Sequence, residues 1–248
     1  MAMAPPEEVF AFLKKAHDEF QPLSVEIRFD KNHALHSHVM ALYGSIIELT
    51  GSSIILVDRK IIAGVPILLR AILEAYVDLL NLVQDPKYGY QLHFGYLKEW
   101  LKLLDEAKTG KSEYLMAISK DPSLDKTIAE WKAQKDKLEA AGYKGLTIEG
   151  KFKAAGMEKE YRSIYNSLCS DSHNNLRSLI GRHIEVDKSD FSVVFYKAYT
   201  LGDSAVYVGM GLELLMRATQ LTHGFFKSSV QEKILEYRKH VDKLRGDG

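Results

Sequence analysis

The pattern of apolar and polar residues is helical over most of the chain. Apolar residues recur at intervals of three and four, as Val9, Phe10, Leu13 and Ala16 do near the start. We expect helices over residues 5–20, 32–50, 61–84, 86–108, 123–141, 158–181, 194–222 and 228–244. Prolines and acidic residues at the starts and glycines near the ends set these bounds. The predicted fold is therefore an all-α helical bundle.

Two segments depart from the helical pattern. Residues 142–156 are rich in glycine and lysine and predict a loop with one short helix. Residues 184–195 alternate as a β-hairpin does, so we expect a short hairpin there. The chain contains no Pro/Ser/Gly-rich linker and no internal repeat, which predicts a single helical domain over residues 1–248.

Charge and cysteine content narrow the function classes. The chain has 33 Lys and Arg against 33 Asp and Glu. It lacks the basic excess with which proteins coat nucleic acid, so any nucleic-acid site is expected to be local. The single cysteine, Cys169, excludes an intrachain disulfide and favours a cytoplasmic location. The longest apolar run, residues 61–69, is shorter than the roughly 20 residues of a membrane span, so no membrane association is expected.

A narrow polar strip runs along the expected helix 61–84. Nearly every residue from Pro66 onward is apolar, except Arg70, Glu74, Asp78 and Asn81. Their spacing of four, four and three places them on one face of a helix that is otherwise apolar all round. Either this strip meets water or forms a structural ion pair, or it lines an internal pocket where burial of the charges requires partners.

A second informative stretch lies in the expected helix 158–181. Tyr161 and Tyr165 share a helix face, and His173 follows within the polar run 170–175. Such a run favours caps and turns over helix interiors, so we expect a break near Ser170 and His173 at a helix junction.

The two stretches together predict one polar site. In this hypothesis the strip on helix 61–84 faces the histidine junction and Arg177 across an internal pocket. His173 acts as general acid and base, and Arg70 or Arg177 stabilises charge. The predicted catalytic residues are Arg70, Glu74, Asp78, His173 and Arg177, and the predicted substrate-binding residues are Tyr161, Tyr165 and Asn174.

These motifs resemble those of an uncharacterised family of bacterial all-helical proteins. The family pattern is Arg-x-x-x-Glu-x-x-x-Asp, followed on a later helix by Tyr-x-x-x-Tyr-x-x-Leu-(Ser/Cys)-x-x-x-His. Arg70, Glu74 and Asp78 match the first motif, and the segment from Tyr161 to His173 matches the second. The resemblance covers roughly residues 40 to 220.

Such proteins resemble HEPN-like helical domains, many of which are metal-independent ribonucleases or toxins. That resemblance implies an Arg–His pair separated by four to six residues, with a polar residue after the arginine. The chain offers Arg28 with His33 and Arg177 with His183. Phe29 departs from the pattern in the first pair, and neither pair contains His173.

The hypotheses that follow are a HEPN-like ribonuclease or toxin-type effector acting on RNA or a small phosphorylated ligand, or a non-catalytic binding protein with a structural polar network. We expect no cofactor and no metal. Cys169 and His173 are four residues apart, but a lone cysteine is more often inert and buried. His33, His36 and His38 are expected to be a solvated cluster. The apolar helix expected over residues 194–216 suggests a homodimer seam.

Overall fold

The computed structural model describes residues 4–173, 175–187, 190–197 and 199–246. The regular structure of these residues is helical except for one two-stranded hairpin, which confirms the predicted all-α class. The chain packs into two compact units: residues 1–83 together with 152–248, and residues 84–151. The single domain expected from the sequence stays a prediction beside this division.

Five long helices build the first unit, and shorter elements follow α3 in sequence. The long helices are α1 (Pro6–Leu23), α2 (Ala34–Asp58), α3 (Val65–Gln84), α11 (Ala205–Phe225) and α12 (Gln231–Arg245). The shorter elements are α7 (Ile148–Ala154), α8 (Glu158–Glu160), the π turn η4 (Tyr161–Tyr165), α9 (Asn166–Ser172) and α10 (Leu176–His183). Single 3₁₀ turns are η1 (Ser24–Glu26), η2 (Ile62–Gly64) and η5 (Gly202–Ser204).

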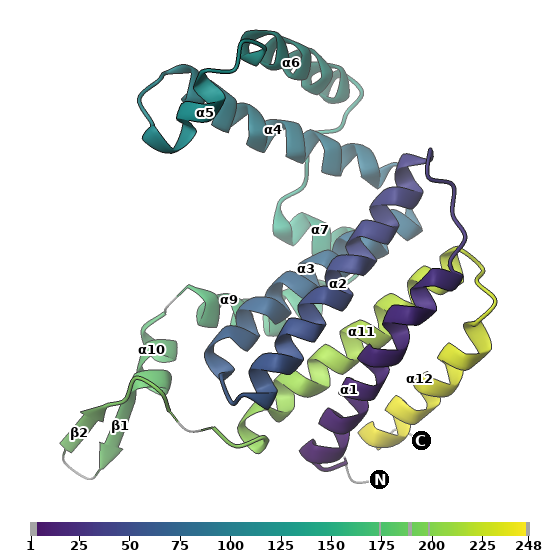
Figure 1. Ribbon diagram of the computed structural model, residues 1–248, viewed down its shortest axis with the longest axis vertical. Coiled ribbons are helices and arrows are strands. Elements are labelled where there is room, and N and C mark those ends of the chain that lie inside the picture. Colours follow the sequence, from purple (N-terminus) through teal and green to yellow (C-terminus); the bar gives the residue numbers. More distant parts are fainter. Residues whose placement is uncertain (1–3, 174, 188–189, 198, 247–248) are drawn as a thin grey trace. The chain divides into compact units, whose positions relative to one another are not determined.

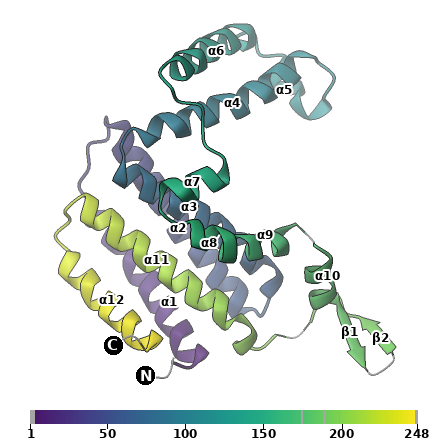
Figure 2. The same ribbon diagram turned by 180° about the vertical axis from the view of Figure 1, so that it is seen from behind.

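Helix α11 is the central helix of the first unit. It packs against α1, α2 and α12, which lie beside it in both views (Figures 1 and 2). Its apolar residues Leu212, Leu215 and Met216 are buried in this core. These three side chains pack within the unit and are not free to form the dimer seam expected over residues 194–216, whereas Val206 on the same helix is exposed. The homodimer stays a prediction.

Helix α2 continues past Gly51, where the sequence predicted its end. Nε2 of His17 lies 3.1 Å from the carbonyl oxygen of Ile47. A Cβ at position 51 would come within 2.8 Å of the same His17 nitrogen. Gly51 therefore admits a neighbouring side chain from α1 and does not end the helix.

Helix α2 is also long and apolar enough to cross a membrane by length and composition. Its apolar residues are interrupted by Ser, Gly, His and Glu, so no unbroken apolar run marks it in the sequence. Val39, Tyr43 and Ile46 of α2 are fully buried, and the helix packs against α1 and α11. These contacts are those of a core helix in a helical bundle.

The segment expected to form one helix over residues 158–181 is divided into α8, η4, α9 and α10. Helix α9 ends at Ser172 with His173 as its C-cap, close to the break expected near Ser170. Asn175 caps α10 by accepting a hydrogen bond from the backbone nitrogen of Arg177 at 2.8 Å. Beyond α10, β1 (Ile184–Asp187) pairs antiparallel with β2 (Asp190–Val193), which confirms the predicted hairpin.

The second unit consists of α4 (Tyr88–Lys108), η3 (Glu113–Leu115), α5 (Met116–Ser119) and α6 (Leu124–Ala140). Helices α4 and α6 pack through Leu101, Leu104, Leu124 and Ile128. In the glycine-rich loop that follows, the side-chain oxygen of Gln91 accepts hydrogen bonds from the backbone nitrogens of Lys144 and Gly145.

Candidate functional site

The predicted polar strip lies on α3 as the spacing required. Arg70, Glu74 and Asp78 follow one another at single-turn intervals, while Leu69, Ile72 and Leu73 beside them are buried. The side chains of Arg70 and Glu74 keep exposed fractions of 25% and 33%. Arg70, Glu74 and Asp78 are therefore half-buried at the surface of the first unit, where an internal pocket was expected, whereas Asn81 at the end of the strip is buried.

The second motif approaches α3 from η4 and α9. Tyr165 is the last residue of the π turn, and His173 is the C-cap residue of α9. π turns are rare and are often found at functional sites. His173 thus lies at a helix junction, as the polar run predicted.

Four side chains from these two segments form one hydrogen-bonded group, which we call the Arg70 cluster: Arg70, Glu74, Tyr165 and His173. Arg70 Nε donates to Glu74 Oε1 at 2.9 Å, and Nη2 donates to the Tyr165 hydroxyl at 3.2 Å. Arg70 Nη1 lies 2.9 Å from His173 Nε2. The Tyr165 hydroxyl in turn donates to Glu74 Oε1 at 2.8 Å. The structure therefore brings two segments together that are about one hundred residues apart in sequence.

The contact with Arg70 fixes which nitrogen of His173 accepts a hydrogen bond. A guanidinium group only donates, so His173 Nε2 is the acceptor and the ring hydrogen is on Nδ1 in this arrangement. Arg70 uses three of its five N–H hydrogens in the cluster, which leaves one on Nη1 and one on Nη2. These remaining hydrogens are available to a ligand.

The Tyr165 ring is part of the core, while its hydroxyl belongs to the cluster. The side chain is 4% exposed and its ring packs 5.0 Å from Phe152 and 5.4 Å from Tyr161, centroid to centroid. Burial, together with the hydrogen bond to Glu74, raises the pKa of Tyr165 above its ordinary value. A buried ring cannot stack on a ligand, so Tyr165 positions Arg70, and the predicted substrate-binding role stays open for the half-buried Tyr161.

Hydrogen bonds within the cluster also stabilise the charged form of Arg70. Burial opposes the charged form, but the hydrogen bonds with Tyr165 and Glu74 outweigh it and raise the pKa of Arg70. The Cys169 thiol is also close to the Tyr165 hydroxyl and to Arg70. Cys169, expected from the sequence to be inert and buried, is half-buried and precedes His173 by one helical turn.

The structure places Arg177 in different surroundings from those predicted. Its side chain lines a cavity of about 540 Å³ between α9, α10 and α11, with Asp171, Arg182 and Tyr207 among the other lining residues. Burial and the adjacent Asp171 raise the pKa of Tyr207. Asn174, the other residue predicted near His173, lies outside the described residues.

In the second Arg–His pair, Arg177 lines this cavity and His183 contacts the base of the hairpin. Nδ1 of His183, at the end of α10, lies 3.0 Å from the carbonyl oxygen of Val194 and so ties the base of the hairpin to the helix. In the first pair, the ring of His33 stacks on His36 at 4.5 Å between centroids. Among the described residues, no group of three or more His, Cys, Asp or Glu side chains is arranged to hold a metal ion.

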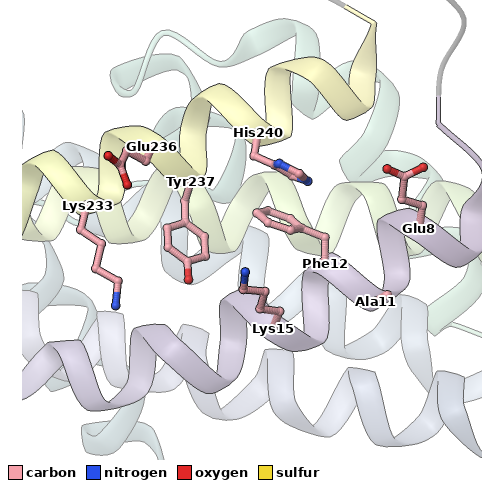
Figure 3. Close-up of a pocket in the computed structure, with 8 residues that line it drawn as sticks. All are labelled: Glu8, Ala11, Phe12, Lys15, Lys233, Glu236, Tyr237 and His240. Carbon is pink, nitrogen blue, oxygen red and sulfur yellow. The ribbon is translucent and has the colours of Figure 1, made fainter.

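A further groove of about 560 Å³ lies between α1 and α12 (Figure 3). His240 stacks on Phe12 at 4.3 Å between ring centroids, and Lys15 rises from α1 toward the ring of Tyr237. Lys233 is paired with Glu19 of α1 at 3.0 Å. The described residues that line this groove include two lysines and two glutamates, so its lining has no excess of either charge.

Comparison with known proteins adds the family. The model of a family of unknown function, DUF5677, matches residues 36–192, which include both motifs of the Arg70 cluster. No curated protein and no solved structure matches the chain. The match extends over more than half of the sequence, and the chain belongs to the DUF5677 family, whose function is unknown.

Proposed function

We propose that the Arg70 cluster binds a phosphate group of RNA or of a small phosphorylated ligand. The observation that carries this proposal is the arrangement of Arg70: Glu74 and Tyr165 fix the guanidinium, while Nη1 and Nη2 each keep a hydrogen for a ligand. Paired N–H groups in a planar fork match two phosphate oxygens. The neutral net charge of the chain suits a local site of this kind better than a long nucleic-acid groove.

RNA cleavage is the second candidate, and the position of His173 favours it. A phosphate bound to the remaining hydrogens of Nη1 and Nη2 would lie beside His173 Nε2, whose lone pair becomes available when the ring turns away from its contact with Nη1. His173 would then take the proton of the ribose 2′-hydroxyl as that oxygen bonds to phosphorus. The bond from phosphorus to the 5′-oxygen breaks, and the 5′-oxygen takes a proton from solvent. Arg70 would stabilise the charge that develops on the phosphate oxygens.

A binding assay tests the primary proposal. Fluorescence anisotropy with a labelled short RNA is expected to show binding that weakens roughly 10- to 100-fold in Arg70→Gln, the range expected when hydrogen bonds to a charged group are lost. Arg59→Gln removes the same charge from an exposed residue at the end of α2 and is the matched control. Equal affinity of Arg70→Gln, Arg59→Gln and the unmodified chain would overturn the proposal.

Tyr165→Phe separates positioning from fold stability. It keeps the buried ring against Phe152 but removes the hydroxyl that contacts both Arg70 and Glu74. If the cluster serves only the fold, thermal unfolding shifts and ligand affinity does not. We expect the affinity to fall, with the circular dichroism spectrum unchanged.

Cleavage is tested by incubating the chain with RNA in the presence and absence of EDTA. Cleavage that persists in EDTA and disappears in His173→Ala is the expected result, and His38→Ala, an exposed histidine at the start of α2, is the control. Binding without cleavage would leave the phosphate-binding proposal standing and remove the enzymatic one.

A further inference from the structure

The cavity between α9, α10 and α11 is lined largely by hydrogen-bonding side chains. Ser170 and Asp171 come from α9, Arg177 and Arg182 from α10, and Tyr207 from α11. Its volume of about 540 Å³ is within the range of small-ligand sites. Two arginines against one carboxylate leave the lining with a positive balance.

Arg177 and Arg182 differ in exposure and in the hydrogen bonds that their side chains form. The guanidinium of Arg177 is exposed and forms no hydrogen bond or ion pair with another described residue. Arg182 is half-buried, and its Nε donates to the carbonyl oxygen of Ser178 at 3.2 Å, which fixes the side chain along α10. One anchored and one uncommitted guanidinium on the same wall suit a phosphate group, which accepts hydrogen bonds at several oxygens.

Asp171, the carboxylate among the described lining residues, is suited to bind a hydroxyl group of the ligand. Asp171 Oδ1 accepts a hydrogen bond from the Ser178 hydroxyl at 2.7 Å, and Oδ2 accepts one from the Tyr207 hydroxyl at 3.3 Å. An ionised carboxylate has about four acceptor positions, so Asp171 can accept further hydrogen bonds. It repels a phosphate but attracts a hydroxyl group, as carboxylates do when they bind ribose hydroxyls.

We propose that this cavity binds one nucleotide of a single-stranded RNA, with its phosphate on Arg177 and Arg182 and its ribose 2′-hydroxyl donating to Asp171. The inference rests on the proposed function, because it supplies a second contact for the same ligand. Helix α9 carries both sites: Cys169 and the C-cap His173 belong to the Arg70 side, and Ser170 and Asp171 to the cavity. A strand that passes α9 would meet both.

The test compares two ligands that differ only in the 2′-hydroxyl. Fluorescein-labelled oligouridylate and its 2′-deoxy counterpart are titrated with the full chain by fluorescence anisotropy, and gel electrophoresis checks that the strands stay intact. We expect the RNA to bind roughly tenfold more tightly, the value of one good hydrogen bond. Asp171→Ala should abolish this preference, because it removes the acceptor of the 2′-hydroxyl.

Arg177→Gln tests the phosphate contact independently. It should weaken both ligands roughly tenfold and reduce the slope of log affinity against log salt by about one. Arg177 is exposed, so the variant is expected to fold, and Arg162→Gln, another exposed arginine, is the matched control. Unchanged affinity in Arg177→Gln, with loss of binding in Arg70→Gln, would overturn this inference and keep the proposed function. If the unmodified chain binds neither strand, this inference falls together with the RNA form of the proposed function.

Discussion

Stability of the first unit should depend on pH through one buried histidine. His223 lies on α11, is 0% exposed and packs edge-on to the ring of Tyr43. Its Nδ1 lies 2.7 Å from the Ser228 hydroxyl, whereas Nε2 is buried without a hydrogen-bond partner among the described residues. Burial disfavours the charged ring and lowers the pKa of His223 to about 4, from an ordinary value of 6.5.

The size of the effect follows from proton linkage. Between pH 6.5 and 4 the unfolded chain binds a proton at this residue and the folded chain does not, so the free energy of unfolding falls as pH falls. With these two pKa values, the contribution of His223 decreases by about 2 kcal/mol between pH 7 and pH 5. The slope is about 1 kcal/mol per pH unit at pH 6, the middle of that range.

Urea unfolding at pH 7, 6 and 5 measures this contribution. Far-ultraviolet circular dichroism is the suitable signal, because both tryptophans, Trp100 and Trp131, lie in the second unit and would report its unfolding. His223→Gln should be less dependent on pH than the unmodified chain by about 2 kcal/mol over this range. His38→Gln, at an exposed position, should keep the original dependence. Parallel loss of stability in the His223 variant and the unmodified chain would refute the reasoning.

Three further predictions concern packing, backbone conformation and ion pairs. Gly51→Ala should be less stable than Gly44→Ala by about 1–2 kcal/mol in urea unfolding, because only the first added Cβ meets His17, at 2.8 Å. Lys60→Gly should increase the free energy of unfolding by up to about 1 kcal/mol and so raise the thermal midpoint, because Lys60, which follows the C-cap Arg59 of α2, has a φ of 59° that favours glycine. Burial opposes ionisation of Glu213, but hydrogen bonds and charges from Arg238 and Arg217 outweigh burial and lower its pKa. The free energy of unfolding should therefore fall as the pH drops below 4.5, the ordinary pKa of a glutamate. Glu213→Gln should lose that dependence in acid titrations followed by circular dichroism.

The parts of the fold that the sequence predicted were those set by periodicity and by polar runs. The four-residue spacing of Arg70 and Glu74 placed both on one face of α3, and the polar run before Asn175 produced a helix junction with a side-chain cap. The alternation in the hairpin pairs Val186 with Phe191 on one face and Glu185 with Ser192 on the other. These features depend on residues that are close together in the sequence, so they can be predicted from the sequence alone.

The parts that failed depend on contacts between distant segments. Gly51 resembles a helix stop in sequence, and only the approach of His17 from α1 shows why the helix passes through it. The glycines near residues 202–211 resembled a dimer seam, but Gly211 faces Leu13 and Leu69 across van der Waals contacts inside the unit. Periodicity also cannot reveal a π turn, because η4 adds one residue to a turn without changing the composition of the helix.

That extra residue bears on how the candidate site is built. Within η4 the rings of Tyr161 and Tyr165 lie nearly parallel, with an interplanar angle of 19° and centroids 5.4 Å apart. Phe152 contacts both rings, and this packing holds Tyr165 where its hydroxyl reaches Arg70 and Glu74. Rigid placement of an arginine is what phosphate recognition requires, whereas a merely structural ion pair four residues apart on α3 would form without any tyrosine. The packing of Tyr161, Tyr165 and Phe152 therefore favours the proposal that the Arg70 cluster binds phosphate over a purely structural role.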